Sequence, residues 1–159
     1  MASLVTDQGI VHYETYGRGR PVLLLHGWLG SWALWRDTIE VLGRDFKTYS
    51  LDFWGFGESS PTGVDLNFSV ENFVELVYQF MDRLGIRRAP LIGHSMGGTG
   101  ALMLAERYPQ LFAAAAASQP MMNYANGASW VDELEHRLQQ VIAVGSPTDH
   151  TQHQVELGR

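Results

Sequence analysis

A continuous apolar run over residues 21–25 limits the fold of this chain more than any other feature. The run reads Pro-Val-Leu-Leu-Leu, so neither side of an extended strand there would carry a polar side chain. Such a strand is typical of the centre of a parallel sheet, where helices cover both faces. Residues 47–53, 89–93 and 111–117 predict further strands, with helical patterns or loops between them. The alternation predicts the α/β class with a mostly parallel, doubly wound sheet.

Helical periodicity fills the intervals between these strands. Ser69 predicts the N-cap of the clearest helix, whose apolar residues recur every three or four positions until Gly85 ends it. Ser31 predicts a second cap, in front of apolar residues at the same spacing. Residues 96–108 predict a third helix, which Pro109 ends.

The two ends of the chain complete the expected order of elements. Alternating side chains over residues 3–16, with turn residues in the middle, predict an N-terminal β-hairpin. Residues 130–140 predict a helix, and residues 141–145 predict a last short strand. We therefore expect one domain over residues 1–159.

Composition excludes several classes of function. The chain has 159 residues, with 11 Lys and Arg against 17 Asp and Glu, a net charge of −6. This balance lacks the basic surface that nucleic-acid binding requires. The absence of Cys excludes disulfides, thiol catalysis and cysteine zinc sites. No apolar stretch resembles a secretory signal or is long enough to cross a membrane, so we expect a cytoplasmic protein with no membrane partner.

The strongest chemical signal is the sequence Gly-His-Ser-Met-Gly at residues 93–97. It fits the pattern G-x-S-x-G and lies between a predicted strand and a predicted helix, the context that this motif requires. A sharp turn there would hold the Ser95 hydroxyl away from the backbone, and the small residues Gly93 and Gly97 would let the chain pass close to itself. The following helix would direct its first N–H groups at developing negative charge.

The chain resembles the α/β-hydrolase fold family over nearly its whole length. Three motifs carry the resemblance in the family's order: residues 26–28 (His-Gly-Trp), residues 52–59 (Asp-Phe-Trp-Gly-Phe-Gly-Glu-Ser) and residues 93–97. The resemblance implies that the backbone N–H groups of Trp28 and Met96 form an oxyanion hole. It also implies that Asp52 begins a structural turn near the pocket. The residues that the resemblance assigns to shaping the motifs are His26, Gly27, Gly93, His94 and Gly97.

A serine hydrolase of this family also needs an acid and a base, which follow the serine in the order acid, then His. Residues 141–149 resemble the strand and loop that carry the acid, so Asp149 is the candidate acid. An ordinary turn, which these residue types also favour, is the alternative. Of the six His, His153 is the candidate base because a short tail could bring it over the strand ends. The alternative is that the family's catalytic His is absent.

The C-terminal part of the chain departs from the family pattern. The family places its His after one more strand and helix, whereas this chain ends at Arg159, so we expect a sheet truncated at its C-terminal edge. Residues 108–112 and 141–147 each resemble the same family strand, and the sequence does not choose between them. The segment between the helix predicted after Ser95 and the candidate acid Asp149 has no room for a full lid domain. An apolar edge strand at 141–144 would invite self-association.

These observations together predict a serine hydrolase that cleaves a small or medium carboxylic ester through an acyl-enzyme on Ser95, with no cofactor and no metal. Two alternatives stay open: a catalytically impaired fragment that serves as an interaction module, and a C–C bond hydrolase or peptidase on the same fold. Trp28, Trp32, Trp54 and Phe56 cluster on the loops after the predicted strands. They would either cover the core or form a wall for an apolar group of the substrate.

Overall fold

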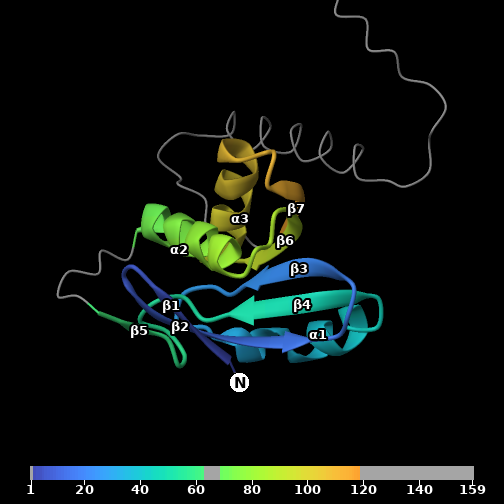
Figure 1. The fold of residues 1–159 in the computed structure, drawn as a ribbon, viewed down its shortest axis with the longest axis horizontal. Helices are drawn as coiled ribbons and strands as arrows, with labels where there is room; N and C mark the ends of the chain where they lie inside the picture. Colours follow the sequence, from blue (N-terminus) through green and yellow to red (C-terminus); the bar gives the residue numbers. More distant parts are fainter. Residues whose placement is uncertain (1, 63–68, 119–159) are drawn as a thin grey trace, which may run out of the picture.

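The computed structural model describes residues 2–62 and 69–118 (Figure 1). The helix predicted at 130–140, the strand at 141–145 and the sheet edge expected to self-associate lie outside the described residues. So do the candidate acid Asp149 and the candidate base His153. These expectations therefore stay predictions.

Within the described residues, seven strands form one mixed sheet in the order β1-β2-β4-β3-β6-β7, and β5 pairs with β2. The strands β3, β4, β6 and β7 are parallel, and β2 is antiparallel to β1, β4 and β5. The predicted hairpin and α/β class are confirmed, and β5 is an addition within a predicted loop. The strands are β1 Ala2–Thr6, β2 Gly9–Tyr16, β3 Arg20–Leu25, β4 Phe46–Leu51, β5 Ser60–Pro61, β6 Ala89–His94 and β7 Phe112–Ser118.

The helices lie where the capping residues predict them. The Oγ of Ser31 accepts from an N–H in the 3-10 helix η1, Trp32–Trp35, which leads into α1, Arg36–Leu42. The Oγ of Ser69 accepts from the N–H of Asn72 at the start of α2, Val70–Arg83, and α3 spans Met96–Arg107. Within the ranges described, no helix combines the length and the apolar character needed to cross a membrane.

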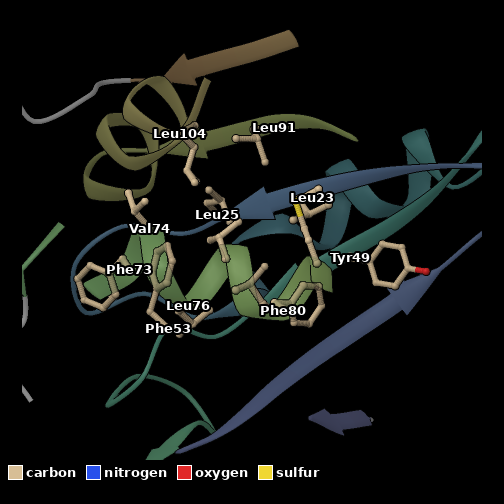
Figure 2. Close-up of a cluster of buried hydrophobic side chains, with 14 of the residues drawn as sticks. Leu23, Leu25, Tyr49, Phe53, Phe73, Val74, Leu76, Phe80, Leu91 and Leu104 are labelled. Carbon is tan, nitrogen blue, oxygen red and sulfur yellow. The ribbon is translucent and has the colours of Figure 1, made fainter. Parts of the chain in front are cut away.

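Side chains of β3 point alternately to two apolar layers, as a central parallel strand requires. Leu23 and Leu25 pack with α2 and α3 on one face, where Figure 2 shows Phe80 and Leu104 beside them. Val22 and Leu24 pack on the other face against Trp35 and Ile39, from η1 and α1. All four β3 side chains are buried, and each contributes about 1.5–3 kcal/mol through removal from water. Figure 1 accordingly shows α1 on one side of the sheet and α2 and α3 on the other.

The parallel register brings three loops to one edge of the sheet. Leu25 at the end of β3 pairs with Gly93 of β6 on one side and with Leu51 of β4 on the other. The chain leaves each of these three strands at nearly the same level. The segments that follow β3, β4 and β6 are therefore neighbours at the carboxyl edge, which is where open α/β sheets bind ligands.

Candidate active site

Ser95 lies at a sharp corner between β6 and α3. Its backbone has φ 53° and ψ −118°, and among the described residues that are not glycine it shares a positive φ with Leu29 alone. A conformation of this kind costs about 1–3 kcal/mol and persists where the surrounding structure enforces it. Two bonds do so here: the N–H of Ser95 donates to the carbonyl of Ser118 at 2.8 Å, and its carbonyl accepts from the N–H of Thr99 at 3.0 Å.

Two glycines make the corner possible because no side chain would fit at either position. A Cβ at Gly93 would overlap the carbonyl of Gly97, and a Cβ at Gly97 would overlap the carbonyls of Leu25 and His26. The backbone of the corner is thus in direct contact with itself and with the end of β3. Ser95 itself remains half-buried at this edge.

The first turn of α3 begins directly after Ser95. Met96 is the first residue of this helix and its side chain is buried, so the helix terminus is anchored in the core. The first N–H groups of an α-helix have no partner within the helix and carry a partial positive charge. The backbone N–H of Met96 belongs to this group, at the position that the sequence predicts for an oxyanion donor.

The loop after β3 packs directly against the serine. A Cβ placed on Gly27 would lie 2.8 Å from the Cβ of Ser95 and 3.4 Å from its Oγ. The loop turns back immediately afterwards, because the N–H of Gly30 donates to the carbonyl of Gly27 at 3.1 Å. Trp28, whose N–H is the second predicted oxyanion donor, and Leu29 are the two central residues of this turn. The side chain of Leu29 is 82% exposed and its φ is 55°.

His26 fixes the start of this loop. The N–H of Phe53 donates to Nε2 at 3.0 Å, so Nδ1 carries the ring proton and donates to the carbonyl of Gly27 at 2.7 Å. Burial lowers the pKa of His26 from its ordinary value of 6.5, and the bond to Gly27 and the charge of Asp52 oppose this effect. The neutral ring therefore links the loop after β3 to the loop after β4. A general base near Ser95 would have to come from another residue.

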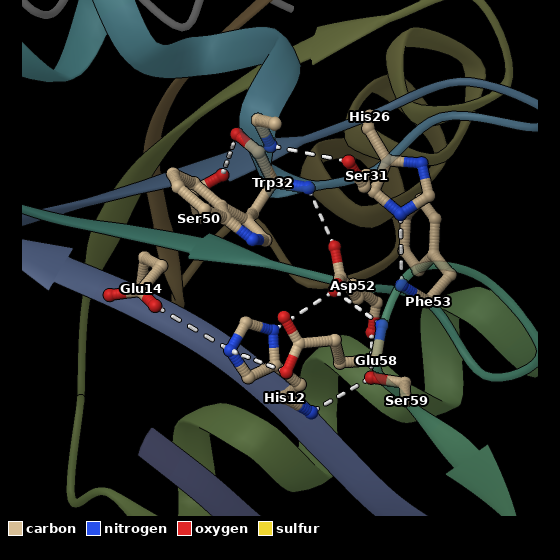
Figure 3. Close-up of polar contacts among 11 residues, drawn as sticks. His12, Glu14, His26, Ser31, Trp32, Ser50, Asp52, Phe53, Glu58 and Ser59 are labelled. Carbon is tan, nitrogen blue, oxygen red and sulfur yellow. Dashed lines mark hydrogen bonds and ion pairs between the residues drawn. The ribbon is translucent and has the colours of Figure 1, made fainter. Parts of the chain in front are cut away.

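Asp52 is a buried carboxylate that contacts three separate segments (Figure 3). Its Oδ1 accepts from the N–H of Trp32 at 2.6 Å. Its Oδ2 accepts from the N–H of Glu58 at 2.9 Å and lies 3.0 Å from Nδ1 of His12. These contacts agree with the turn-stabilising role that the resemblance implies for Asp52, and they extend it to the start of η1.

His12 belongs to this arrangement as well, although the sequence does not predict its contact with Asp52. His12 is on β2 and buried, and its Nε2 faces Oε1 of Glu14 at 3.6 Å and Oε2 of Glu58 at 4.0 Å. Because a carboxylate can only accept, the contact with Asp52 places a proton on Nδ1. Alternation along β2 puts His12 on the face opposite Val11 and Tyr13, the residues that enter the core, and this polar position was the available signal.

The aromatic residues of the loops divide between the two expected roles. Trp54 is fully buried, and Phe56 is buried against the rings of His26 and Phe73. These rings cover the core. Trp28 is 48% exposed and meets Phe56 edge to face, with ring centroids 5.1 Å apart. Its indole therefore stands at the edge that carries Ser95, where it could contact a substrate.

The remaining predicted site residues are His94, Asp149 and His153. His94 is the last residue of β6 and is partly buried, directly before the corner. Asp149 and His153 lie outside the described residues, so the structure does not place them relative to Ser95. Over residues 2–62 and 69–118, no group of three or more His, Asp or Glu side chains could hold a metal ion.

The chain is similar to several known proteins in sequence and in structure. A soluble epoxide hydrolase of Corynebacterium sp. (strain C12) is 38% identical over 97 residues, which cover 60% of this chain and 32% of that protein. The solved structure of a membrane phospholipase A, described as a bacterial virulence factor, superimposes with a TM-score of 0.74 at 27% identity. That match covers 86% of this chain and 44% of that chain. An N-acyl homoserine lactonase gives a TM-score of 0.70 at 26% identity, over 75% of this chain and 44% of that chain.

These relatives are hydrolases, and the chain spans between 20% and 39% of the length of the curated relatives compared. Residues 20–146 match the family described as the alpha/beta hydrolase fold. The match includes the corner at Ser95 and the loops after β3 and β4 that pack beside it. This chain belongs to the α/β-hydrolase fold family.

Proposed function

We propose that this chain is a serine hydrolase that cleaves a small or medium carboxylic ester through an acyl-enzyme on Ser95. The observation that supports this most is the corner at Ser95. A non-glycine residue with φ 53° is held in that conformation directly before a helix, and a loop packs against its Cβ. Strain of this kind at a partly exposed serine is typical of an activated nucleophile.

A serine at position 95 helps to choose between two reactions that the relatives' names suggest, the opening of an epoxide and the hydrolysis of an ester or lactone. A serine oxygen that opened an epoxide would become an ether, and water would find no carbonyl to attack in that ether. Turnover would therefore stop after one cycle. A serine oxygen that attacks an ester or a lactone becomes an acyl ester, which water cleaves to regenerate the hydroxyl. Ser95 thus favours a carbonyl substrate over an epoxide.

The proposed reaction has two steps, acylation of Ser95 and hydrolysis of the acyl-enzyme. The Oγ of Ser95 attacks the carbonyl carbon, its proton passes to the base, and the alkoxide leaves with that proton as an alcohol. Water then attacks the acyl ester, and the carboxylic acid leaves while the hydroxyl of Ser95 is restored. The backbone N–H groups of Trp28 and Met96 would stabilise the negative oxygen of each tetrahedral intermediate. Asp149 and His153 are proposed as acid and base from the sequence alone.

The test is hydrolysis of p-nitrophenyl esters of increasing acyl length by the full chain, with Ser95→Ala as the control. We expect steady release of p-nitrophenol that Ser95→Ala abolishes. Release that stops at one equivalent per chain would support acylation of Ser95 and favour the catalytically impaired alternative. Hydrolysis that survives Ser95→Ala, or no release at all from a folded chain, would overturn the proposal.

The same panel separates the other enzymatic alternative. A peptidase would use the same nucleophile and cleave the matching p-nitroanilide at a rate comparable to the ester. Because an anilide is a far poorer leaving group, an ester hydrolase of this design should cleave the ester much faster. Comparable rates on the two substrates would replace the ester proposal with a peptidase.

A further inference from the structure

The loop between β3 and η1 is fastened at both of its ends to the end of β4 (Figure 3). At the start of the loop, the N–H of Phe53 donates to His26 at 3.0 Å. At its far end, the N–H of Trp32 donates to Asp52 at 2.6 Å, and the hydroxyl of Ser50 donates to the carbonyl of Trp32 at 3.2 Å. We call Ser50, Asp52 and the N–H of Phe53 the β4 clamp.

Asp52 is the charged member of the β4 clamp, and its surroundings fix its orientation. It is fully buried, and a buried carboxylate must be met by donors. Glu58 N–H and His12 Nδ1 hold Oδ2, which leaves Oδ1 for Trp32. The carboxylate also fills the space in front of Gly57, where a Cβ would overlap it. Asp52 therefore has one available position, and the amide of Trp32 is placed by it.

The clamped segment is the one that touches the proposed nucleophile. Gly27 contacts Ser95, and Trp28 lies between the two fastened ends. The turn is closed by the bond from the N–H of Gly30 to the carbonyl of Gly27 and contains Leu29 at φ 55°, so its distance from Ser95 also depends on how its two ends are held. A hydrogen-bond donor stabilises an oxyanion when it lies within about 2.7–3.1 Å of the charge, and small displacements weaken it.

We propose that Asp52 is a positioning residue of this site. Held by His12 from β2, it fastens the end of the loop at Trp32 and thereby sets the N–H of Trp28 relative to Ser95. The proposal rests on the proposed function, because it assumes that Trp28 serves as an oxyanion donor. It goes beyond a turn-stabilising role, because it ties the carboxylate to the rate of the reaction at Ser95.

The decisive variant is Asp52→Asn, which keeps the volume and replaces one oxygen with an NH₂ group. That group would face the N–H of Glu58 and Nδ1 of His12, or, in the other orientation, the N–H of Trp32. At least one of these bonds is lost in either case. Asp45→Asn is the matched control, because Asp45 is exposed and precedes β4.

Two readouts are combined. The first is kinetic: we expect kcat for the p-nitrophenyl ester and the rate of fluorophosphonate labelling to fall by between about 10-fold and 100-fold, with KM unchanged. A loss of donor alignment acts on the transition state and not on substrate binding. The second readout is amide hydrogen exchange, in which residues 27–32 should exchange faster in Asp52→Asn than in Asp45→Asn. A folded Asp52→Asn with unchanged kcat and unchanged exchange would overturn the proposal.

The two proposals fail separately. If the unmodified chain neither cleaves esters nor reacts with fluorophosphonate, the proposed function fails, and the exchange of residues 27–32 still tests the β4 clamp. If Asp52→Asn does not fold, Ser50→Ala replaces it, because that change removes only the hydroxyl bond to Trp32. Faster exchange in Ser50→Ala would then support the clamp, and exchange at the unmodified rate would overturn it.

Discussion

The substitution Gly27→Ala tests how closely the loop after β3 approaches the nucleophile. The added Cβ would lie 2.8 Å from the Cβ of Ser95 and 3.2 Å from the carbonyl of His94. Carbon atoms in contact are normally about 3.5–4.0 Å apart, so the loop and the corner must separate by about 0.7 Å or more. Overpacking of this kind costs about 1–3 kcal/mol of stability. A displacement near 1 Å at reacting groups costs about 100-fold in rate.

The assay for Gly27→Ala is the second-order rate constant of fluorophosphonate labelling, with urea unfolding to measure stability. Gly100→Ala is the matched control, because a Cβ at Gly100 in α3 would meet no atom of residues 2–62 or 69–118 within 4 Å, apart from the helix's own backbone. Replacing a helical glycine with alanine should stabilise the chain by about 0.5–1 kcal/mol and leave labelling unchanged. We expect labelling of Gly27→Ala to be about 100-fold slower. A folded Gly27→Ala that labels at the unmodified rate would refute the contact on which the site is built.

Three further predictions concern stability and are measured by urea unfolding. Because the pKa of His26 is lowered in the folded chain, the unfolded chain binds the proton first as the pH falls, and the contribution of His26 to stability should decrease from pH 6.5 downward. The free energy of unfolding is compared between the unmodified chain and His26→Gln. A difference between the two that is the same at about pH 7.5 and about pH 5.5 would contradict this. Leu29→Gly should stabilise the chain by about 0.5 kcal/mol, because the free energy gained by relieving the positive φ exceeds the cost of a more flexible unfolded chain. A loss of stability above about 1 kcal/mol would show that the exposed Leu29 side chain makes a needed contact. Ser69→Ala should cost about 1 kcal/mol by removing the cap bond to Asn72, and an unchanged midpoint would mean that the first turn of α2 does not depend on it.

Much of the fold could be predicted because local patterns and tertiary packing agree. The run at 21–25 is apolar on both faces, and it lies in the sheet with helices on both faces. Ser31 and Ser69 cap helices because their side chains satisfy nearby N–H groups, a contact within three residues. The short strand β5 was missed because Ser60 and Pro61 are turn residues, and their pairing with β2 depends on a distant strand.

The site was predictable where its parts are adjacent in sequence. The corner at Ser95 turns within residues 93–97, so the pattern G-x-S-x-G between a predicted strand and a predicted helix indicates it. The contacts of Asp52 join His12 and Trp32, which are 40 and 20 residues away, and no local pattern encodes such pairs. The exposure of Trp28 beside the buried Phe56 likewise depends on how two loops meet. The role of Asp149 remains a prediction from resemblance, and the role of His153 remains a prediction from its place in the short tail after Asp149.

The most direct test of this account is to treat the folded full chain with a fluorophosphonate and locate the adduct by mass spectrometry of its peptides. We expect one adduct on Ser95, formed faster than on a free serine and absent from Ser95→Ala. A folded chain that stays unmodified, or one that carries the adduct on another serine such as Ser59, would contradict the assignment of Ser95 as the nucleophile.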